Sequence, residues 1–136
     1  MPYTWNEAFE SGVSVIDEQH KQLFNAVNAF QQAYSSGQDS DERLRETLNF
    51  LVNYTVEHFR DEEALQVQYD FPDYMRHRQQ HGDFTKTVLA LVDRFNQEGA
   101  NDTLMLEMYE TIGNWLVHHI QSDDFVVAAY IREMES

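Results

Sequence analysis

The sequence contains no cysteine among its 136 residues and is poor in glycine and proline, with five and two residues respectively. The absence of cysteine excludes disulfides, thiolate metal sites, iron–sulfur clusters and cysteine nucleophiles. The scarcity of glycine and proline excludes collagen-like and low-complexity chains. With 42% hydrophobic residues, a chain of this length can bury a core of its own.

Long apolar runs are also missing. No uninterrupted stretch approaches the roughly 20 residues that a membrane-spanning helix needs. The first residues, MPYTWNE, carry neither the basic region nor the apolar region of a secretory signal. The sequence therefore predicts a soluble cytoplasmic protein that does not insert into a membrane.

Basic residues are few. Nine Lys and Arg stand against 24 Asp and Glu, which gives a formal net charge of −15. Such a charge repels phosphate backbones and anionic lipid headgroups. Nucleic acids and membrane surfaces are therefore not expected as partners.

Four segments of the chain have apolar residues at alternating steps of three and four, which is typical of amphipathic helices. Strand-like alternation is missing. We predict helices over residues 17–35, 41–66, 73–97 and 102–133. Short connections place consecutive helices side by side and antiparallel, so the predicted fold is all-α, an up-down-up-down four-helix bundle. We expect one domain over 1–136, with residues 1–16 as an ordered N-terminal arm because they are too apolar for a free tail.

Histidines fall on the apolar stripes of these helices. Five of the six do so, together with one carboxylate, and these residues are His20, His58, Glu62, His77, His81 and His119. A single histidine on such a stripe is usually a hydrogen-bonded core residue. A buried polar group left unpaired costs about 1–3 kcal/mol, and a buried carboxylate costs more. Coordination of cations would satisfy the whole set at once.

The spacing of these residues supports a metal site. His58 and Glu62 are four residues apart, and so are His77 and His81. Residues four apart stand one above the other on a helix and can reach a shared ion. The two pairs lie on neighbouring predicted helices, with further histidines on the other two helices.

Four motifs carry a resemblance to a known family: IDEQHKQL at 16–23, HFRDEE at 58–63, HRQQH at 77–81 and WLVHHIQSDD at 115–124. In these motifs and in their order the chain resembles the hemerythrin family over nearly its full length, and in particular its bacterial single-domain members. The resemblance implies two non-haem iron ions, joined by an oxo or hydroxo bridge. The ligands it implies are His20, His58, Glu62, His77, His81, His119 and Asp124.

The resemblance also implies how the ligands are divided. His77, His81 and His119 would hold one iron, and His20 and His58 would hold the other. Glu62 and Asp124 would bridge the two ions. The vacant position on the iron with fewer histidines would bind dioxygen.

The last motif contains two doublets, His118-His119 and Asp123-Asp124. The apolar stripe favours His119 and places His118 about 100° away, on the surface. The aspartate stays open on these grounds, because Asp123 lies about 40° and Asp124 about 140° from His119 on an ideal helix. The family pattern favours Asp124, which requires a local irregularity of the helix. We predict Asp124 as the ligand.

An oxygen pocket has to be small, apolar and dry. Four residues flank the ligand positions and resemble the wall of the family's pocket, although ordinary bundle core explains each of them equally well: Phe59, Trp115, Leu116 and Ile120. The predicted function is reversible dioxygen binding for transport, storage or buffering, by a binding protein and not an enzyme. We expect a monomer that serves an oxygen-consuming recipient, with oligomers left open.

Three alternatives remain at this point. The same site could serve in sensing of oxygen, nitric oxide or redox state, through a change in the N-terminal arm. It could be an enzymatic centre that consumes peroxide or reduces nitric oxide. It could also be a structural zinc site, but structural zinc normally has four ligands and a closed shell, which seven ligands for two ions do not provide.

Overall fold

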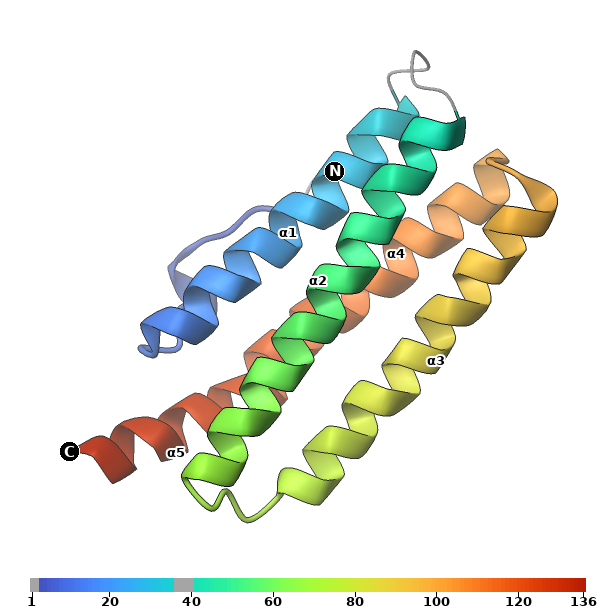
Figure 1. Ribbon diagram of the computed structural model, residues 1–136. Helices are drawn as coiled ribbons and strands as arrows, with labels where there is room; N and C mark the ends of the chain where they lie inside the picture. The colour runs from blue at the N-terminus through green and yellow to red at the C-terminus, as the bar shows by residue number, and fades with distance from the viewer. Residues whose placement is uncertain (1–2, 36–40) are drawn as a thin grey trace.

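The computed structural model describes residues 3–35 and 41–136, and in these ranges every regular element is helical. The elements are the 3-10 turn Glu7–Phe9, α1 (Ser14–Ser35), α2 (Asp41–Gln68), α3 (Tyr74–Glu98), α4 (Asp102–His119), the π-helical turn Ile120–Asp124, and α5 (Phe125–Glu135). Figure 1 shows α1 to α4 running alternately up and down. Each of α1 and α3 contacts both α2 and α4, which closes the bundle. The predicted all-α four-helix bundle is confirmed.

The boundaries of the helices follow from local chemistry. At the start of α4, the side chain of Asn101 accepts a hydrogen bond of 2.8 Å from the backbone nitrogen of Leu104, which satisfies one donor of the first turn. α3 ends at Gly99, whose φ of 78° is a left-handed conformation that glycine adopts without strain. Between α2 and α3, Asp70 takes a φ of 53° two residues before Pro72. The chain therefore reverses sharply at this end of the bundle.

α2 and α3 agree with their predicted ranges within two residues, whereas the other two predicted helices differ more. α1 begins at Ser14, three residues earlier than residue 17, because the carboxylate of Asp17 accepts hydrogen bonds from the backbone nitrogen and the hydroxyl of Ser11. These bonds hold the chain in place just before the first turn. The range 102–133 is not one regular helix, because the π-helical turn divides α4 from α5.

The N-terminal segment runs back along α1 (Figure 1). Two hydrogen bonds join the backbone of Tyr3 to the side chain of Asn28, at 2.9 and 2.6 Å. Further along, Trp5 and Phe9 pack against Phe24 of α1, with ring centroids 5.5 and 5.0 Å apart. The segment is therefore fixed to the bundle by both polar and apolar contacts.

The apolar core is interrupted at one level by polar side chains. Along α1, for example, buried Ile16 and Leu23 lie on either side of buried His20. Apolar clusters lie on both sides of this level: one contains Leu23 and Leu116, and another contains Ile16 and Val127. None of the helices in the described part of the chain combines the length and the apolarity needed to cross a membrane.

Candidate metal centre

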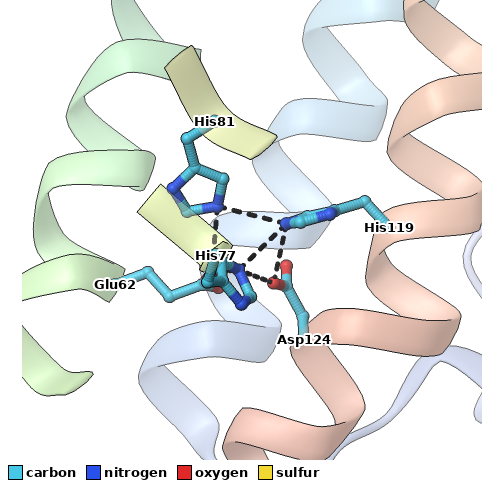
Figure 2. Close-up of side chains that lie close together, drawn as sticks. All are labelled: Glu62, His77, His81, His119 and Asp124. Carbon is cyan, nitrogen blue, oxygen red and sulfur yellow. Dashed lines mark hydrogen bonds and ion pairs between the residues drawn. The ribbon is translucent and has the colours of Figure 1, made fainter. Parts of the chain in front are cut away.

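Seven ionisable side chains meet in the interior of the bundle. They are all at most 3% exposed and comprise His20, His58, Glu62, His77, His81, His119 and Asp124. Figure 2 shows five of them, with the side chains from α2, α3, α4 and the π-helical turn pointing toward one another. The structure thus brings together every residue that the sequence predicted as a ligand.

The local helix geometry accounts for their convergence. His58 and Glu62 stand one turn apart on α2, and His77 and His81 stand one turn apart on α3, so each pair presents its side chains on one face. α1 and α4 each contribute one histidine at the same level, His20 and His119.

The seventh residue depends on the π-helical turn. Asp124 follows His119 by five residues, and the wider turn Ile120–Asp124 brings it onto the inner face, where it is fully buried. Asp123 instead lies at the edge, with Oδ1 3.5 Å from Arg76 Nη2 and Oδ2 3.2 Å from His119 Nδ1. His118 is exposed. The irregular turn therefore places Asp124, and not Asp123, among the buried groups.

The seven residues form two overlapping sets of potential metal ligands. The first set has three histidines, His77, His81 and His119, and the second has two, His20 and His58. Both sets contain Glu62 and Asp124, and within each set the ligand atoms lie within 4.8 Å of one another. We call these the three-histidine position and the two-histidine position.

Each shared carboxylate directs one oxygen to each position. Oε1 of Glu62 lies 2.6 Å from His77 Nε2, and Oε2 lies 3.5 Å from His58 Nε2. Oδ1 of Asp124 lies 3.0 Å from His77 Nε2, and Oδ2 lies 2.8 Å from His20 Nε2. This is the arrangement expected of carboxylates that bridge two cations.

Hydrogen bonds between neutral imidazoles cannot satisfy the three-histidine position. His119 Nε2 lies 3.0 Å from His77 Nε2 and 3.1 Å from His81 Nε2. A neutral imidazole with its proton on Nδ1 offers only a lone pair at Nε2, and two lone pairs repel. Both oxygens of Glu62 and Oδ1 of Asp124 make no hydrogen bond of good geometry to any described residue. A cation at the centre would satisfy all of these atoms.

Outer hydrogen bonds define which nitrogen faces inward. His81 Nδ1 lies 2.9 Å from Glu63 Oε2, and His58 Nδ1 lies 2.7 Å from Gln19 Oε1. An acceptor at Nδ1 holds the proton there and leaves the Nε2 lone pair for a metal, as is usual for metal-binding histidines. The sequence did not identify these partners, because many acidic residues were candidates and only the packing of α1 and α3 on α2 selects among them.

The electrostatics of the site favour ionised carboxylates. Burial by itself would raise the pKa of Asp124, but the neighbouring imidazoles, His119 foremost, outweigh it and hold the pKa well below its ordinary value. Burial and the charge of Asp124 would raise the pKa of Glu62, but the imidazoles of His77 and His81 lower it. Burial would lower the pKa of His77, whereas Asp124 and Glu62 raise it to about 10. The buried negative charge thus attracts protons or cations strongly.

Apolar and aromatic residues flank the ligand positions in the sequence. Phe59, Leu116 and Ile120 are each at most 4% exposed, as expected for a dry wall. Trp115 is half-buried and stacks on the ring of His119, with centroids 4.3 Å apart and planes 16° apart. Of the four residues predicted to line an oxygen pocket, Phe59 and Trp115 stack on ligand residues, and Leu116 and Ile120 are buried.

The fold and the site together define a four-helix-bundle protein with a buried cluster of histidines and carboxylates that could hold metal ions. The sequence pattern of the hemerythrin HHE cation binding domain matches residues 11–131. The chain therefore belongs to the hemerythrin family, as its motifs predicted.

Curated relatives and solved structures agree with this assignment. The chain is 29% identical to a bacteriohemerythrin of Stenotrophomonas maltophilia, over 94% of this chain and 80% of that one. It is 30% identical to a myohemerythrin of Theromyzon tessulatum, over 91% and 89% of the two chains. Among solved structures, a wild-type hemerythrin superposes with a TM-score of 0.82 at 25% identity, covering 95% of this chain and 97% of that one.

Proposed function

We propose that this protein binds dioxygen reversibly at a pair of non-haem iron ions and serves to transport, store or buffer it. The observation that carries the proposal is the unequal sharing of ligands around two bridging carboxylates. The three-histidine position offers five ligand residues, and the two-histidine position offers four. An ion in the second position therefore keeps more room for an exogenous ligand than its neighbour does.

The donor set fits iron. Imidazoles combined with carboxylates suit Fe²⁺ and other divalent transition metals. The orphaned oxygens of Glu62 and Asp124 lie where bridging ligands are required, and the outer acceptors of His58 and His81 present the correct nitrogen. When bound, the two ferrous ions supply the electrons that dioxygen binding draws on.

The protein's own residues make the binding reversible. Phe59, Leu116 and Ile120 exclude water from the centre, and a dry wall removes the proton donors that would release the ligand in reduced form. Glu62 and Asp124 offset part of the positive charge of the ions inside the low-dielectric core. These residues bind, shield and position, which is the work of a carrier and not of an enzyme.

An optical titration tests the proposal. The protein is loaded with Fe²⁺ without oxygen, exposed to air and then flushed with argon. We expect a visible charge-transfer band that forms in air, disappears under argon and returns over repeated cycles. A band that forms once and does not reverse would contradict reversible binding.

Sensing of oxygen, nitric oxide or redox state is the second candidate, and one contact favours it. The ring of Trp5 lies 6.5 Å from that of His20, so the N-terminal segment touches a residue of the two-histidine position. In a Trp115→Phe variant, where Trp5 is the one remaining tryptophan, a large change in fluorescence on cycling between air and argon would support sensing, whereas unchanged fluorescence would support the carrier function.

A further inference from the structure

The two metal positions differ in the groups that accept hydrogen bonds from their histidines. In the three-histidine position, His81 Nδ1 faces the carboxylate of Glu63 at 2.9 Å, and His119 Nδ1 faces that of Asp123 at 3.2 Å. In the two-histidine position, His58 Nδ1 faces the neutral amide oxygen of Gln19 at 2.7 Å. Nδ1 of His20 is buried and makes no hydrogen bond to any described residue. Carboxylates therefore lie directly against the Nδ1 atoms of two histidines in one position and of neither histidine in the other.

The orientation of the Gln19 amide is determined by a neighbour on α2. Its Nε2 donates a hydrogen bond of 2.9 Å to Oδ2 of Asp61. An ionised carboxylate can only accept, so the NH₂ group of Gln19 must face Asp61 and its oxygen must face His58. His58 must then donate from Nδ1. Asp61 thus determines the orientation of the Gln19 amide. The amide in turn determines the tautomer of His58, in which the Nε2 lone pair is directed inward.

The charge of the acceptor affects how well the histidine binds a metal. A carboxylate draws the Nδ1 proton toward itself and makes the opposite nitrogen a stronger donor, whereas a neutral amide does so less. Loss of such outer partners typically changes metal affinity by about 10–100-fold. Glu63 and Asp123 meet arginines at 4.0 and 3.5 Å, but Arg78 and Arg76 are 60% and 68% exposed, so water screens these pairs.

We propose that Gln19 is a positioning residue that keeps the two-histidine position the weaker of the two. It holds His58 in the metal-binding tautomer, and as a neutral acceptor it withholds the extra donor strength that Glu63 gives to His81. This inference rests on the proposed function, since it concerns the same pair of ions. The two positions differ in their number of histidines, and we assign a further part of their difference in metal affinity to the neutral side chain at residue 19.

A double substitution that moves one charge tests the proposal. Gln19→Glu with Asp61→Asn places a carboxylate against His58 and an amide behind it, so the hydrogen-bonded chain and the net charge are both kept. Anaerobic titration with Co²⁺ resolves the two binding steps by optical absorption. We expect the weaker step to tighten about tenfold in the double variant and the stronger step to stay unchanged. Asp61→Asn alone is the matched control: an asparagine amide oxygen can still accept the hydrogen bond from Gln19 Nε2, so the weaker step should stay within about twofold.

Two further variants complete the experiment. Gln19→Leu removes the acceptor and should weaken the second step about tenfold, which shows that the amide is needed. Glu63→Gln makes the reciprocal change at His81 and should weaken the stronger step. Circular dichroism of each Co²⁺-loaded variant verifies that the bundle is intact.

The outcomes separate the two proposals. If the unaltered protein binds fewer than two Co²⁺ ions, the two-metal centre of the proposed function is wrong, and this inference with it. If two ions bind but the weaker step is unchanged or loosened in the double variant, the role of Gln19 is overturned and the proposed function stands.

Discussion

The ring of Phe59 lies parallel to that of His81, with centroids 3.9 Å apart and planes 4° apart. Phe59 is next in sequence to His58 and is itself 4% exposed. One aromatic side chain therefore fixes the ring plane of a ligand residue in the three-histidine position while its neighbour in sequence serves the two-histidine position. Packing and coordination geometry are coupled at this point of α2.

Truncation of this ring is expected to destabilise the protein. Phe59→Ala removes a buried aromatic side chain and its stacking on His81, and should lower the free energy of unfolding by about 3–5 kcal/mol. Urea denaturation monitored by circular dichroism measures the loss. Phe50→Ala, at a position 58% exposed on the same helix, is the control and should change it by no more than about 0.5 kcal/mol. Equal losses in the two variants would contradict the packing role of Phe59.

The two aspartates at the end of the π-helical turn should differ in their effect on metal content. Asp124→Asn removes the negative charge shared by the two positions, so iron content after anaerobic loading should fall below two ions per chain. Asp123→Asn removes only an outer partner of His119 and should keep both ions, with affinity lowered about tenfold. Elemental analysis of the gel-filtered protein compares them. Retention of both ions by Asp124→Asn would refute its assignment as a bridging ligand.

The free energy of unfolding of the chelator-treated protein should decrease as the pH rises above 6.5, because of the titration of His77. The pKa of His77 rises on folding from 6.5 to about 10, so its protonation favours the folded state. This contribution is fully present below pH 6.5 and is lost as the pH rises toward 10. The lowered pKa values of Glu62 and Asp124 contribute stability above the ordinary carboxyl range that is lost in acid.

We therefore expect the urea midpoint of the chelator-treated protein to fall between pH 6.5 and pH 10. His77→Gln should reduce this slope, and it serves as the control; the raised pKa of His58 contributes the remainder. A midpoint that rises with pH in the unaltered protein would show that His77 is not protonated on folding. Metal binding displaces the same proton, so affinity for the ions should increase over this interval.

Gly113 and Gly82 offer a matched pair of helical glycines. A Cβ at Gly113 would collide with the ring of Tyr3, whereas a Cβ at Gly82 meets no atom within 4 Å. Gly82→Ala should therefore stabilise the protein by about 0.5–1 kcal/mol, the usual gain in a helix. Gly113→Ala should stabilise it less or destabilise it, because Tyr3 must leave its place.

Hydrogen exchange reports this displacement directly. The Tyr3 backbone nitrogen donates to Asn28 Oδ1, and its amide should lose protection in Gly113→Ala while staying protected in Gly82→Ala. Unchanged protection in both variants would show that the position of the N-terminal segment does not depend on the absence of a side chain at Gly113 in α4.

Hydrophobic periodicity and histidine spacing predicted the bundle and the convergence of five histidines with Glu62, because both depend only on which face of a regular helix a residue occupies. Asp124 was predicted from the family pattern, and not from periodicity, because it requires a turn that is wider than regular. Nothing in Ile120 to Asp124 signals such a turn, since ideal geometry favours Asp123. Gln19 was not found for a different reason: its partners His58 and Asp61 lie on another helix, and the contact exists only after α1 packs on α2.

The π-helical turn holds one residue more than a regular helical turn. The faces of α4 and α5 are consequently aligned as they would be in one regular helix with one residue fewer between them. Deleting Ser122 would remove the surplus and leave Asp124 and the apolar face of α5 on their present side. The same deletion in the middle of α4 would rotate every later side chain by about 100°. Changes in chain length can therefore be absorbed at the turn without misaligning the helices on either side.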